Sequence, residues 1–219
     1  MISTRDNDGL PDVEGLRRLL QSMAVLDAII CPEWSYRYYS FNSRWASGEQ
    51  MGSMRNGSGD EFFALFNAAG CFLKGLAHES PMALGGRGPG QVWPGVLDGV
   101  PEVFGTCLAE PAFSMADTTF CLWRRPGDDS WRLGPVSFPP GQDPDGSEGL
   151  LSPLDGEPET YRAWAEDYYE REIPLAGVGH IYSHGPLTLA LISSLNPDLA
   201  PEDLRADVDE IGYPGGLAT

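Results

Sequence analysis

A block of strand-like segments separated by short loops, residues 36–77, constrains the fold more than any other part of the chain. Its strongest segment is EFFALFN at Glu61–Asn67, in which both alternating faces are apolar, as expected of a central strand covered on both sides. Asn56-Gly57 precedes this segment and favours a tight hairpin, because both residues tolerate positive φ. Since such short loops cannot hold a crossover connection, the block predicts a four-stranded antiparallel meander.

The segments on either side of this block predict an α+β fold. A second hairpin over 118–136 would extend the sheet to about six strands. Apolar residues three and four apart predict an N-terminal helix from Leu16 to Ile30, ended by Pro32. A loop is expected over 80–92 and an interrupted helix over 96–109. We therefore expect a mostly antiparallel sheet packed by the N-terminal helix and a C-terminal helical region.

The domain organisation is best explained by one domain over residues 1–219. Residues 139–158 are rich in Pro, Gly and Asp and form a long loop before an acidic helical region, 158–212. The predicted helix that starts at Pro158 has an inward stripe that includes Tyr161 and Trp164. This stripe needs an apolar surface, and the sheet is the obvious one.

The charge is distributed unevenly along the chain. Residues 1–135 hold 16 acidic and 11 basic residues, whereas residues 136–219 hold 16 acidic residues and three arginines. The second region therefore carries −13 of the net charge of −18. Such a region repels nucleic acid and anionic membranes and attracts basic protein surfaces.

This asymmetry favours a non-enzymatic binding protein, similar in role to an immunity protein or inhibitor, with a basic protein as its partner. The alternative is that the acidity only provides solubility. No cofactor is expected. The candidate binding residues are the outward-facing acidic side chains of the C-terminal helices, Glu166, Asp167, Glu170, Glu202, Asp203, Asp207 and Glu210.

An alternative function is a metal-dependent hydrolase. His180 and His184 have a spacing that places two ligands on one helical face, and His78-Glu79 could add ligands in space. The residues between the two histidines lack the glutamate of the H-E-x-x-H pattern, and flanking glycines leave open whether this segment is helical. A histidine pair that packs and hydrogen-bonds is the competing interpretation, so we lean towards a protein without enzymatic activity.

The aromatic segment between residues 34 and 45 has several possible interpretations. Its tyrosines and tryptophans alternate with arginines, which would suit base stacking if the overall charge did not oppose nucleic acid. A sheet core or a protein-binding face rich in Tyr and Trp explains it better. A pocket for a small ligand in this aromatic sheet is a third hypothesis for function.

Several segments together resemble a set of uncharacterised bacterial proteins of similar length. The runs are YYSFNSRW at 38–45, MRNGSGDE at 54–61, HES at 78–80 and the ending from Leu195 to Pro214. The resemblance implies a self-contained bacterial domain and assigns no activity.

The chain has no stretch apolar and long enough to span a membrane, and its first residues lack the pattern of a secretion signal, so a cytoplasmic location is expected. The four cysteines lie among apolar neighbours without a C-x-x-C pair. We expect them to be buried, reduced thiols.

Overall fold

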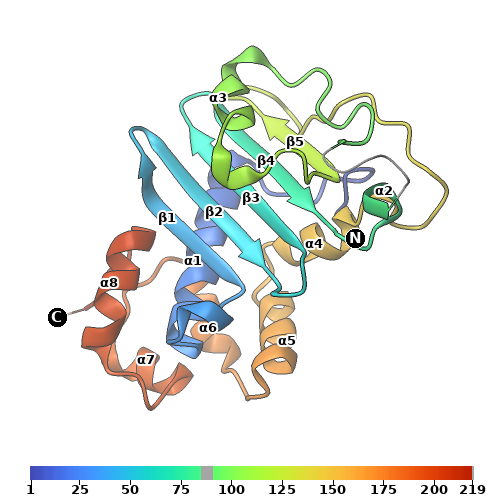
Figure 1. The fold of residues 1–219 in the computed structure, drawn as a ribbon. Helices are drawn as coiled ribbons and strands as arrows, with labels where there is room; N and C mark the ends of the chain where they lie inside the picture. Colours follow the sequence, from blue (N-terminus) through green and yellow to red (C-terminus); the bar gives the residue numbers. More distant parts are fainter. Residues whose placement is uncertain (85–90, 219) are drawn as a thin grey trace. The chain divides into compact units, whose positions relative to one another are not determined.

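The computed structural model describes residues 1–84 and 91–218 (Figure 1). The glycines at 85, 86, 88 and 90 of the loop expected over 80–92 lie outside the described residues. The strands are β1 (Tyr39–Ala46), β2 (Glu49–Arg55), β3 (Glu61–Asn67), β4 (Gly70–Leu76) and β5 (Phe120–Arg124). The α-helices are α1 (Val13–Ile30), α2 (Pro81–Leu84), α3 (Gly105–Leu108), α4 (Ser147–Leu151), α5 (Pro158–Tyr169), α6 (Leu175–Tyr182), α7 (Leu189–Leu195) and α8 (Pro201–Ile211). Short 3-10 turns lie at η1 (Trp34–Tyr36), η2 (Glu102–Phe104), η3 (Pro111–Phe113) and η4 (Ser152–Leu154).

The strands follow one another in the sheet in the order β1-β2-β3-β4-β5, and the predicted α+β class is confirmed (Figure 1). The central pairs are antiparallel, with Phe63 opposite Lys74 and Leu73 opposite Leu122. The meander over 36–77 is therefore confirmed. The five residues of β3 from Phe62 to Phe66 are all buried, as its two apolar faces predict.

The expected sixth strand is wrong. Residues 130–136 contribute one isolated bridge, between Trp123 and Arg132, instead of a strand. Beyond the bridge, Pro135 has no N–H to donate, and the N–H of Val136 turns back to the carbonyl of Gly134. The chain therefore leaves β5 after a single pair of residues.

Three other segments also differ from the sequence prediction. The loop expected over 80–92 contains the short helix α2. The helix expected over 96–109 is reduced to η2 and α3, because Gly99 has φ +78 and Pro101 cannot donate inside a helix. Conversely, the loop expected over 139–158 contains α4 and η4. Among the described residues, no helix has the length and apolar character needed to cross a membrane.

The chain divides into two compact units, each made of two separate segments. Unit 1 comprises residues 1–13 and 53–155, and unit 2 comprises residues 14–52 and 156–219. In unit 1 the core lies around β3, β4 and β5, where Phe63 stacks on Phe113 with ring centres 5.2 Å apart. Its N-terminal segment is anchored by Thr4, whose hydroxyl donates to the buried carboxylate of Asp145.

Unit 2 is organised around α1. Thirteen of the 18 residues of α1 are buried, including the whole stretch from Leu19 to Ile30. The helix packs on the sheet at Gly52, where an added Cβ would lie 2.7 Å from Leu20 Cδ1. Side-chain donors of α1 reach later segments, since Ser22 donates to the carbonyl of Ile181 and Gln21 to that of Ile211.

The helices α5 and α8 begin where the sequence indicates, and α8 also ends where expected, at Gly212, whereas α5 ends at Tyr169, before Pro174, which the sequence indicated as its end. Pro158 and Pro201 occupy the first turns of α5 and α8. Glu170 and Gly212 follow these helices with φ of 51° and 64°, the left-handed geometry that terminates a helix.

Candidate functional site

The most exposed aromatic side chains of unit 2 lie on and beside η1. Trp34 and Tyr36 are 60% and 62% exposed, and Tyr168 of α5 is 41% exposed. The hydroxyl of Tyr168 donates to the carbonyl of Tyr36 at 3.3 Å, so the two tyrosines are neighbours. We call Trp34, Tyr36 and Tyr168 the aromatic patch. Exposed Trp and Tyr are the residues that most often supply the binding energy of protein interfaces.

Arg37 holds in place the segment that carries Trp34 and Tyr36. Its side chain is only 7% exposed, and its guanidinium binds both carboxylate oxygens of Asp207 at 2.7 and 3.0 Å. The same group donates to the carbonyls of Cys31 and Pro32 at 2.8 and 2.6 Å. These carbonyls follow α1 and have no partner within the helix, so Arg37 both caps the helix end and joins it to α8.

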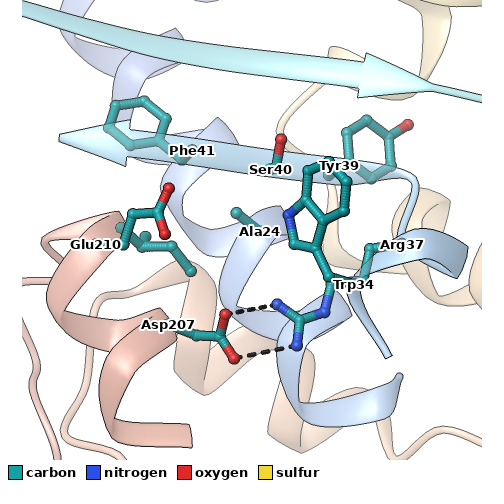
Figure 2. A pocket seen from close by; sticks show the side chains of 9 residues that line it. Ala24, Trp34, Arg37, Tyr39, Ser40, Phe41, Asp207 and Glu210 are labelled. Atoms are coloured by element: carbon teal, nitrogen blue, oxygen red, sulfur yellow. Dashed lines mark hydrogen bonds and ion pairs between the residues drawn. The ribbon is translucent and has the colours of Figure 1, made fainter. Parts of the chain in front are cut away.

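A small pocket opens beside the patch (Figure 2). In that view, Trp34 of η1 and Glu210 of α8 flank the pocket, and the Arg37–Asp207 pair lies below it. Its cavity volume of about 20 Å³ holds little more than one water molecule, so the pocket is too small for a cofactor or metabolite and can take at most the tip of one side chain. Its lining residues are Ala24, Trp34, Arg37, Tyr39, Ser40, Phe41, Asp207, Glu210 and Ile211.

The acidic residues of α8 that the sequence offered as binding candidates have different environments. Asp207 is paired with Arg37, whereas Glu210 accepts a hydrogen bond at 3.2 Å from the neutral amide of Asn42. Glu202 and Asp203 are exposed in the first turn, where negative charge also stabilises the helix dipole. The structure therefore brings two of these four residues, Asp207 and Glu210, to the pocket.

The candidates on α5 also divide into two kinds. Glu166 is half-buried, accepts a hydrogen bond from the backbone N–H of Ile173 at 2.9 Å and lies 3.7 Å from Arg162. Asp167 and Glu170 are exposed on either side of Tyr168 along the chain. Glu166 thus has a local structural role, while Asp167 and Glu170 remain on the surface next to the aromatic patch.

The net charge is uneven along the sequence, but it is equal in the two units of the structure. Each unit contains 16 acidic and 7 basic residues, a net charge of −9. Two arginines from residues 37–46 contact the acidic helix α8, because Arg37, just before β1, binds Asp207, and Arg44 of β1 donates to the carbonyl of Asp209. The net charge therefore does not identify a binding surface. The pocket and the aromatic patch are the features that identify one.

Asp27 is a buried carboxyl that the sequence analysis missed. It lies in α1, is completely buried, and accepts hydrogen bonds from the Tyr161 hydroxyl at 2.6 Å and from the N–H groups of Tyr38 and Tyr39 at 2.9 and 2.8 Å. Burial raises the pKa of Asp27 to about 6, although these hydrogen bonds act in the opposite direction. A single Asp inside the apolar run MAVLDAII is the signal that could have indicated it.

The histidines proposed as metal ligands make separate hydrogen bonds. In unit 2, α6 ends at Tyr182, so His184 lies beyond the helix with φ of 59° and does not share a helical face with His180. Nε2 of His180 lies 2.9 Å from the carbonyl of Pro186, and Nε2 of His184 lies 3.0 Å from that of Arg18. Burial lowers the pKa of His184.

In unit 1, Nδ1 of His78 lies 2.8 Å from the carboxylate of Asp60, and Glu79 is exposed. Hydrogen bonds from His78 lower the pKa of Asp60 against the opposing effect of burial. Among residues 1–84 and 91–218, no three His, Cys, Asp or Glu side chains form a group that could hold a metal ion. All four cysteines are free thiols, and burial raises the pKa of Cys71 and Cys121.

Comparison with known proteins adds no family to this description, since no family model, curated protein or solved structure gives a significant match to the chain.

Proposed function

We propose that this chain is a non-enzymatic, acidic binding protein, comparable to an immunity protein or inhibitor, that engages a basic protein through the surface around Trp34. One observation carries the proposal. Trp34, which is 60% exposed, flanks a pocket whose lining includes the carboxylate of Glu210, and this carboxylate accepts a hydrogen bond from the neutral amide of Asn42. Such a pair of groups suits the positively charged tip of a partner's lysine or arginine.

Charge within the pocket favours a cation over an anion. The guanidinium of Arg37 is compensated by both carboxylate oxygens of Asp207. Glu210 accepts a hydrogen bond from the amide of Asn42, and this donor brings no positive charge into the pocket. The indole face of Trp34 would add a cation–π contribution of about 0.5–1 kcal/mol at an exposed site.

The net charge of −9 on unit 2 supports the same kind of partner. It would attract a basic protein and raise the rate of association at low salt, while the pocket and the aromatic patch select the surface that is bound. The proposal includes a cytoplasmic location, which suits four free cysteines because that compartment keeps thiols reduced.

The first test uses defined peptides as probes. The protein is titrated calorimetrically with an array of lysine- and arginine-containing peptides and with matched peptides in which glutamine replaces each basic residue. We expect binding to a subset of the basic peptides, weakened by high salt, and none to the glutamine forms. Trp34→Ala should weaken binding about 30-fold, as expected for the loss of a hot spot worth about 2 kcal/mol.

Leu189→Ala is the matched control, because Leu189 is also a large apolar residue of unit 2 and is 64% exposed, on α7. Its affinity should equal that of the wild type. Glu210→Gln should weaken binding mainly by slowing association. Equal affinities of the wild type and Trp34→Ala, or no binding of any basic peptide, would contradict the proposal.

A further inference from the structure

One carboxyl group in unit 2 joins three separate elements. Asp27 lies on α1, its Oδ2 accepts the backbone N–H groups of Tyr38 and Tyr39 at the start of β1, and its Oδ1 accepts the hydroxyl of Tyr161 from α5. Both of these elements lead directly to the aromatic patch. Residues 34–36 are separated from Tyr38 by Arg37 alone, and Tyr168 lies on the same helix as Tyr161.

The groups that face Asp27 are neutral over the physiological pH range. They come from every element packed around it, namely Cys31 after α1, Tyr38 and Tyr39 at β1, Tyr161, Tyr168 and Tyr169 at α5, and Tyr182 from α6 through its ring contact with Tyr161. Phenols ionise near pH 10 and thiols near pH 8.5 in water, and burial raises the pKa of both Tyr161 and Cys31. Asp27 is thus the member of this group that changes charge below pH 8.

The cations at this end of α1 are occupied elsewhere. Arg171 donates to the carbonyls of Ile30 and Leu195, and Arg37 binds Asp207 and the carbonyls after the helix. The ionised form of Asp27 is therefore held by hydrogen bonds inside a site from which water is excluded. An ionised carboxylate is more stable in contact with water than in such a buried site. Ionisation of Asp27 therefore favours arrangements in which the site is open to water.

We propose that Asp27 is a proton-operated joint that holds the start of β1 and α5 against α1 when it is neutral and loosens them when it loses its proton. Because Tyr39 both bonds to Asp27 and lines the pocket, loosening would disturb the pocket and the aromatic patch together. That consequence rests on the proposed function, whereas the joint itself does not.

The sign of the pH effect follows from linkage. The pKa of Asp27 is raised in the folded protein from 3.8 to about 6, so its contribution to stability is full below about pH 4 and is lost as the pH rises through 6. Between pH 5 and pH 8 the folding equilibrium constant should fall about tenfold from this group. This range also stays above the isoelectric point of about 4.3.

The main experiment compares urea unfolding of the wild type and Asp27→Asn at intervals from pH 5 to pH 8. Asparagine has the same shape and stays neutral, so the about tenfold decrease should appear in the wild type and vanish in the variant. Exchange of the Tyr38 and Tyr39 amide hydrogens should accelerate over the same range beyond the intrinsic rate, again only in the wild type. Equal pH slopes in the two proteins would overturn the joint.

A second variant keeps the proposal testable if Asp27→Asn does not fold. Tyr161→Phe removes one hydrogen bond that stabilises the charged carboxylate and keeps the ring. The midpoint of the Asp27 carboxyl, followed by carbon-13 NMR, should lie near pH 6 in the wild type and higher in Tyr161→Phe. A midpoint near pH 4, or no change in the variant, would contradict the proposal.

The basic peptides separate the joint from the proposed function. Their affinity should fall from pH 5 to pH 8 in the wild type by more than in Asp27→Asn. If the carboxyl titrates as expected and the affinity does not follow, control of binding by the joint is overturned. If no peptide binds either protein at any pH, the proposed function fails. The unfolding and hydrogen-exchange results then test by themselves whether Asp27 acts as the proposed joint.

Discussion

At the scale of single residues, Lys74 shows how a charge can be enclosed by a sheet. It is the one lysine of the sequence, lies on β4, and its side chain is fully buried. Its Nζ donates to the carbonyl of Asp117 at 3.0 Å, lies 3.5 Å from a carboxylate oxygen of Glu61, and lies 5.4 Å from the ring centre of Phe63. Burial lowers the pKa of Lys74, while Glu61 acts in the opposite direction.

This enclosure predicts that Lys74 resists chemical modification. An amine-specific reagent should leave Lys74 unmodified in the native protein, because its Nζ is out of contact with solvent, and should modify it completely in guanidinium chloride. Peptide mass spectrometry would locate the label. Rapid modification of Lys74 under native conditions would show that this part of the sheet opens readily.

At the scale of elements, the start of α4 depends on a glycine. Gly146 has φ +73, and an added Cβ there would overlap the Cβ of Ala77. The loop before the helix is held internally, since Asp143 accepts the N–H groups of Glu148 and Gly149. The short helix therefore begins in the one backbone geometry that lets the loop pack this closely on the chain after β4.

Gly146→Ala should destabilise the protein by about 2–5 kcal/mol, the combined effect of a left-handed backbone and a steric overlap. Gly127→Ala is the control, because Gly127 has a similar φ of +87 with no atom within 4 Å of an added Cβ. It should cost only about 1–2 kcal/mol, from the backbone alone. Urea unfolding of both variants measures the difference, and equal losses would show that the contact with Ala77 relaxes.

At the scale of the whole molecule, negative charge dominates in both units. A net charge of −18, shared equally between them, disfavours the folded state through self-repulsion. The local pairs, such as Arg37 with Asp207, reduce this repulsion at particular points only.

Salt should therefore stabilise this protein. Raising sodium chloride from about 10 mM to about 500 mM at pH 7.5 shortens the screening length and should raise the unfolding temperature by about 3 °C, which corresponds to about 1 kcal/mol. The same titration at pH 5, closer to the isoelectric point of about 4.3, should give a smaller rise. A decrease in unfolding temperature with salt at pH 7.5 would mean that ion pairs outweigh the repulsion.

Elements with strong local patterns could be predicted from the sequence. The apolar stripe of α1, the doubly apolar β3 and the Pro and Gly at the two ends of α8 each lie within one segment. The expected strand at 130–136 failed because its pairing depended on a chain path that Gly134 and Pro135 redirect. Of the acidic candidates, Asp207 and Glu210 reached the pocket, and nothing in the local sequence separated them from Glu202 and Asp203.

The sequence by itself determined the α+β class, the order of the central strands, the main helices and the net negative charge, because periodicity, turn residues and composition act over short distances. Tertiary structure alone decided that Arg37 binds Asp207, 170 positions away, and that Tyr161 reaches Asp27, 134 positions away. Such pairs depend on how distant segments pack, and side chains of one kind are equivalent until that packing gives each a different depth and a different partner.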